Sequence, residues 1–145
     1  MPMSLLRALF APNPPRLAEP DARLALAALL IRVARSDGHY HAAEIAHINH
    51  ILMQRHNLSE TAAAYLRTEA EAVEAEAPDT VRFTRALKAA VPLEDRVALV
   101  EALWTVALAD GGRDADEDRL LRLVANLLGL TDVESAKARQ RVQNR

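Results

Sequence analysis

The chain has 145 residues, of which half are apolar and only 3 % aromatic; its formal net charge is −2 and it contains no cysteine. This composition excludes disulfides, thiolate metal sites and a cysteine nucleophile, and it lacks the basic surplus that a nucleic-acid-binding protein needs. No apolar run reaches the roughly 20 residues of a membrane-spanning helix. Because Ala and Leu dominate the apolar residues and both favour helices, we expect an all-α protein.

Residues 1–20 are expected to lie outside the main domain. Residues 3–10 form a short amphipathic segment, and the sequence APNPP after them cannot continue a helix because it holds three prolines. The segment has neither the length nor the charge of a secretory signal. We therefore expect a cytoplasmic protein, with residues 3–10 offering a weak peripheral contact to the inner face of the membrane.

Residues 21–145 are expected to form one domain of about seven helices. Asp21 is the predicted cap of a helix that is apolar on nearly all sides, which places that helix at the centre of the domain. An amphipathic helix over residues 41–56 follows, and Ser59 is the predicted cap of the next. That helix ends in the acidic run 69–79.

The second half begins with a helix opened by Asp79, and its outer residues Arg82, Arg85 and Lys88 are candidates to balance the acidic run. A second mostly apolar helix follows Pro92 and carries Trp104, which we expect in the core. The remaining predicted elements are a helix over residues 114–128 and a last helix after a capping box formed by Thr131 and Glu134.

Residues 24–59 and 97–132 resemble each other. Both contain the pattern Asp-Gly-x5-Glu between an apolar helix and an amphipathic one, so that Asp37 and Glu44 correspond to Asp110 and Glu117. This predicts a duplicated helical hairpin whose copies pack about a pseudo-twofold axis.

The two Asp residues need an explanation, whereas the Gly suits the left-handed end of a helix. An anion at the C-terminal end of a helix is disfavoured by roughly 0.3–1 kcal/mol. Amide groups of the turn, a basic side chain or a bound cation could offset that cost. Helical geometry turns Glu44 and Glu117 partly inward, towards the turns that carry Asp37 and Asp110.

These paired turns resemble the TerB family of tellurite-resistance proteins, over about residues 20–140. The same domain type occurs in the N-terminal region of membrane-anchored DnaJ-like co-chaperones. The resemblance implies a helical fold and an acidic cluster that binds a divalent cation (Ca²⁺, Mg²⁺, Mn²⁺ or Zn²⁺). Carried over to this chain, the cluster is Asp37, Glu44, Asp110 and Glu117. His39 and His41 depart from the family's acidic or small polar residues, and with Asp114 they are additional candidate ligands.

Several interpretations stay open at this point. The acids could simply accept hydrogen bonds from turn amides, with all five histidines solvated, or His39 and His41 could join Asp37 and Glu44 in a transition-metal site, since imidazole suits Zn²⁺. No catalytic residue and no organic cofactor is predicted. We expect a non-catalytic module of a stress-response system with an unidentified protein partner. The alternatives are a metal-dependent hydrolase or redox enzyme that uses the same acids, and a metal-free adaptor.

Overall fold

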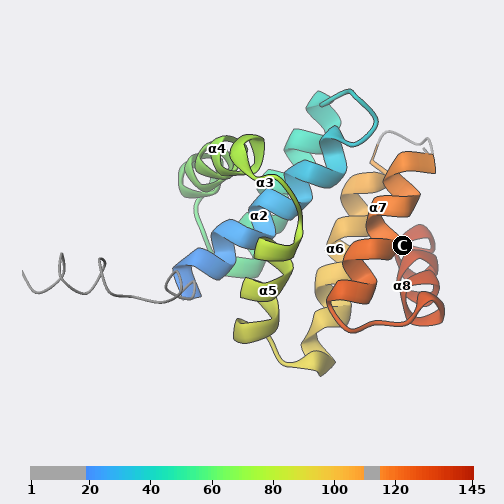
Figure 1. Ribbon diagram of the computed structural model, residues 1–145. Coiled ribbons are helices and arrows are strands. Elements are labelled where there is room, and N and C mark those ends of the chain that lie inside the picture. The colour runs from blue at the N-terminus through green and yellow to red at the C-terminus, as the bar shows by residue number, and fades with distance from the viewer. Residues whose placement is uncertain (1–18, 110–114) are drawn as a thin grey trace, which may run out of the picture.

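The computed structural model describes residues 19–109 and 115–145, and within them all regular structure is helical (Figure 1). The predictions of an all-α fold and of about seven helices are confirmed. The elements in chain order are α2 (Glu19–Arg35), α3 (Ala42–His56), α4 (Glu60–Glu76), α5 (Val81–Ala90), the 3-10 helix η1 (Leu93–Asp95), α6 (Arg96–Ala107), α7 (Ala115–Leu127) and α8 (Asp132–Gln143). Among these described residues, no helix is both long and apolar enough to cross a membrane. The amphipathic segment predicted at residues 3–10 lies outside them.

Helix α2 is the centre of the domain. Every residue from Ala25 to Ile31 is at most 1 % exposed, and α2 contacts α3, α4, α5, α6 and α7. A helix that is apolar nearly all round has no face to offer to water, so its neighbours must enclose it. Helix α6 packs against α2 and also contacts α7 and α8 (Figure 1). Trp104 on α6 is buried, as predicted.

The start of α2 differs from the prediction. The helix begins at Glu19, so Asp21 lies inside the first turn and is not its cap. Pro20 is compatible with this start, because the first N–H groups of a helix have no intrahelical partner and a proline there loses no hydrogen bond.

Helices α3 and α7 end with the same backbone geometry. Asn57 and Gly129 both adopt a left-handed conformation, with φ of 53° and 91°. The next amide, that of Leu58 or Leu130, donates to the carbonyl five residues earlier at 3.0 and 2.9 Å. This pattern satisfies carbonyl groups that the end of a helix would otherwise leave open.

The helices that follow are also capped alike. The Ser59 hydroxyl accepts the Ala62 N–H at 3.1 Å, and the Thr131 hydroxyl accepts the Glu134 N–H at 3.1 Å. Both predicted caps are therefore confirmed. The matched ends are what a duplicated hairpin requires, and the duplication itself stays a prediction.

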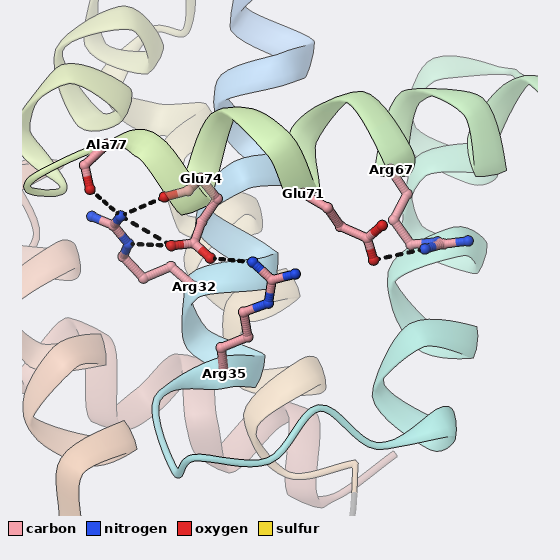
Figure 2. Close-up of polar contacts among 6 residues, drawn as sticks. All are labelled: Arg32, Arg35, Arg67, Glu71, Glu74 and Ala77. Atoms are coloured by element: carbon pink, nitrogen blue, oxygen red, sulfur yellow. Dashed lines mark hydrogen bonds and ion pairs between the residues drawn. The ribbon is translucent and has the colours of Figure 1, made fainter.

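A buried carboxylate joins α4 to α2 (Figure 2). Glu74 is 8 % exposed and accepts hydrogen bonds from the guanidinium of Arg32 at 3.0 and 3.1 Å and from that of Arg35 at 2.8 Å. Arg32 also donates to the backbone carbonyls of Glu74 and Ala77, at 3.0 and 2.8 Å. One side chain of α2 thus neutralises the acid and satisfies the carbonyl end of α4.

The acidic run is therefore balanced by different residues from those predicted. Basic side chains of α5 were the candidates, whereas Arg32 and Arg35 of α2 pair with Glu74, and Arg67 of α4 pairs with Glu71 at 2.8 Å (Figure 2). The sequence does contain a signal for this arrangement. Two arginines stand three residues apart near the end of the apolar helix, where only a paired charge can approach the core.

Replacing Glu74 with Ala should destabilise the domain by about 3–5 kcal/mol, because it leaves a partly buried guanidinium without its carboxylate. Glu76→Ala is the matched control, since Glu76 is exposed on the last turn of the same helix. We expect the control to change stability by less than about 0.5 kcal/mol. Urea denaturation followed by circular dichroism measures both, and equal values would show that the Glu74 pairing does not hold α4.

Candidate functional site

The α2–α3 turn is built around Gly38. This residue has a φ of +84°, and its N–H donates to the carbonyl of Arg35 at 3.0 Å. The predicted left-handed glycine is confirmed, because L-residues with a side chain rarely adopt this conformation. A Cβ added at Gly38 would have no heavy atom within 4 Å, so the turn faces open space there.

Asp37 is held by its own turn. Its side chain is 12 % exposed, and Oδ1 accepts the backbone N–H of His39 at 2.8 Å. A turn amide, a basic side chain or a cation could offset the cost of a negative charge at this helix end, and the turn amide is present. This bond occupies one carboxylate oxygen and leaves Oδ2 directed at His41, whose Nε2 lies 4.0 Å away.

Residues 39–41 alternate in direction. His41 has an extended backbone, with φ of −77° and ψ of 153°, and in extended chain neighbouring side chains point to opposite sides. Tyr40 turns back to the domain, with the Arg35 guanidinium 5.1 Å from its ring centre. Burial first, and then the Glu71 carboxylate, raise the pKa of Tyr40 to about 12. His39 and His41 share the exposed side, where their rings stack at 5.4 Å with an angle of 3° between their planes.

Among the described residues, this alternation brings three metal-ligating side chains together. One ligand atom from each of Asp37, His39 and His41 lies within 4.8 Å of the other two. The group contains one carboxylate and two imidazoles, and both histidines are exposed. These residues are close in sequence, so their proximity was expected. They share one side of the turn because the Tyr40 side chain between the two histidines packs against the domain.

Glu44 and Glu117 point inward, as predicted from helical geometry. They are 0 % and 2 % exposed, in the first turns of α3 and α7. Glu44 Oε1 accepts the backbone N–H of His41 at 2.9 Å, so this buried acid fixes the residue that presents an imidazole to the turn. Asp110 and Asp114 lie outside the described residues, and the second acidic turn stays a prediction.

A separate groove of about 1020 Å³ runs between α3 and α6 and reaches the first turns of α2 and the end of α5. The other three histidines, His47, His50 and His56, line it. His47 and His50 are exposed, as expected of solvated histidines, whereas His56 is partly buried. Burial, followed by the nearby charges of Arg23 and Arg55, lowers the pKa of His56 to about 4. Arg55 precedes His56 in the chain, but the two larger causes, burial and the charge of Arg23 on α2, depend on tertiary packing, so the sequence pattern did not mark His56.

Comparison with known proteins agrees with the helical fold. The model of the family described as tellurite resistance protein TerB matches residues 23–140. The chain belongs to the TerB family. No curated protein and no solved structure matches it. The family match spans both acidic turns, and the resemblance inferred from the repeated Asp-Gly-x5-Glu pattern is confirmed.

The depressed pKa of His56 predicts a loss of stability in acid. His56 takes up a proton near pH 6.5 when unfolded but only near pH 4 when folded. Between these values the unfolded chain binds more protons, so unfolding becomes easier as the pH falls. We expect His56→Gln to reduce the slope of unfolding free energy against pH between pH 6.5 and 4. The reduction corresponds to at most about one proton fewer taken up on unfolding. Urea titrations across this range test it, with exposed His50→Gln as the control that should keep the wild-type slope.

Proposed function

We propose that this TerB protein is a non-catalytic module of a tellurite-resistance-type stress response, which binds a divalent cation at the α2–α3 turn and engages a protein partner. The convergence of Asp37, His39 and His41 is the observation that carries the cation proposal. One carboxylate and two imidazoles with ligand atoms this close to one another form a donor set that a single cation could bind.

The donor set favours zinc over the other expected cations. Ca²⁺ prefers six to eight oxygen ligands, and Mg²⁺ an octahedron of oxygens. Two imidazoles and one carboxylate suit Zn²⁺, which takes three protein ligands and a water in many tetrahedral sites. Ligand atoms of such a site lie about 3.3 Å apart. The 4.0 Å between His41 Nε2 and Asp37 Oδ2 therefore closes with a small rotation of an exposed ring.

Glu44 supports this proposal from behind the turn. Its carboxylate holds the His41 amide at 2.9 Å, so the backbone that presents the second imidazole is fixed before a cation arrives. A ligand that is already oriented loses less conformational entropy on binding. We propose that Asp110, Asp114 and Glu117 form a counterpart at the second turn, where Asp114 stands in place of His41 and Gly112 stands in place of His39.

The partner part of the proposal has a different basis. The resemblance to a domain found beside co-chaperones suggests a module that works by contact with other proteins. The mixed charged and apolar groove between α3 and α6 supplies a surface for such contact.

Zinc should raise the melting temperature of the wild-type protein, because a cation that binds only the folded state stabilises it. At a concentration 100-fold above Kd the gain is about 2.7 kcal/mol, which is on the order of 10 °C for a domain of this size. We expect Asp37→Asn and the double variant His39→Ala/His41→Ala to lose this shift. A metal-panel thermal shift assay with and without chelator measures it.

The matched control is His47→Ala/His50→Ala, which removes two exposed histidines from α3 and leaves the turn intact. It should keep the full zinc shift. If the turn variants respond to zinc as the control does, the turn is not the site. If the wild-type protein responds to no metal, the module is an adaptor without a cation.

A further inference from the structure

We propose that the groove between α3 and α6 docks an amphipathic helix of a partner protein, whose acidic residues lie at the edge of its apolar face. This inference rests on the partner proposed above and names its chemistry. It does not depend on the cation, because the groove and the α2–α3 turn share no residue.

The shape of the groove suits a helix. Its α3 wall consists of residues at helical spacing, from His47 through Ile51 to Arg55, which lie on one face over two turns and about 12 Å. The α6 wall is formed likewise by Ala98, Ala102 and neighbouring residues. Two helical walls that enclose an open trough are the arrangement into which a third helix packs its apolar face.

The floor of the groove is apolar, and its hollow comes from small side chains. Leu26, Leu87 and Leu99 lie beneath it and are at most 2 % exposed. Ala98 and Ala102 on α6 leave room that larger residues would fill. An apolar ridge of leucine-sized side chains would therefore find both space and contact in it.

The charge at one end of the groove selects an acidic partner. Three arginines and a single acid line the groove as a whole, and that acid, Glu101, already pairs with Arg141 and Arg145 at 3.3 and 2.6 Å. Within residues 19–109 and 115–145, neither Arg23 nor Arg55 makes a hydrogen bond or an ion pair, and only the more distant charge of Asp95 acts on Arg55.

His56 lies near both of these arginines, and both of their charges act on its pKa. Two open guanidinium groups this close together form a site that carboxylates satisfy. A helix with Glu or Asp at its edge supplies them while its apolar face covers the floor.

Binding of two designed peptides tests the proposal. The first is a fluorescein-labelled helix of about 14 residues built from Leu, Ala and Glu, with the Glu residues on both borders of the apolar face. The second has every Glu replaced by Lys. Fluorescence anisotropy with the full chain should show saturable binding of the acidic peptide, weakened by added salt, and little binding of the basic one.

Two variants locate the binding. Arg23→Gln/Arg55→Gln should weaken the acidic peptide about tenfold, as expected when two partly exposed charge pairs are lost. Ala102→Leu should weaken it by filling the groove, and circular dichroism melts establish that each variant is folded. Arg82→Gln/Arg85→Gln removes the same charge from exposed positions of α5 outside the groove and should bind as wild type.

Equal affinity for the wild type and for both groove variants would overturn the proposal, as would no binding at all. If laurate binds in an Ala102→Leu-sensitive manner while the peptide does not, the occupant is a small amphiphilic anion and the helix is wrong. The variant His39→Ala/His41→Ala should bind the peptide normally. Failure of the cation proposal and failure of this one are therefore distinguishable.

Discussion

The structure depends on the burial of α2. A helix without a polar face cannot lie at a surface, and the other helices are arranged so that five of them contact it. The two arginines in the last turn of α2 are then matched from outside. Arg32 and Arg35 emerge where α4 ends, and Glu74 meets both. The central position of α2 therefore also decides which residue of the acidic run becomes buried.

The same helix determines the candidate site. Because α2 is enclosed along its length, the chain reaches the surface only after the helix ends at Arg35, and Asp37 lies in the turn that follows. The anchoring of Tyr40 then sets the direction of its two neighbours. An inward tyrosine between two outward histidines is a consequence of extended backbone, and the pairing of the imidazoles follows from it.

Much of this could be predicted from the sequence where the cause is local. The left-handed Gly38, the caps at Ser59 and Thr131 and the inward turn of Glu44 each depend on residues within a few positions of one another. The two arginines near the end of α2 indicate a need for paired acids, but the choice of Glu74 could not be predicted, because it depends on how α2 crosses α4. The low pKa of His56 has the same origin, since Arg23 reaches it from another helix. The role of Asp37 was predicted in part. A turn amide does offset its charge, and the cation remains a proposal.

The two glycine turns differ in what surrounds them. A side chain at Gly129 would meet Leu93 and Arg96 at 3.1 and 3.3 Å, whereas the space beside Gly38 is open. A substitution at Gly129 would therefore disturb packing, whereas at Gly38 only the left-handed backbone opposes it. Under the cation proposal, the exposed histidines beside Gly38 are positions where relatives could carry other ligands without cost to the interior.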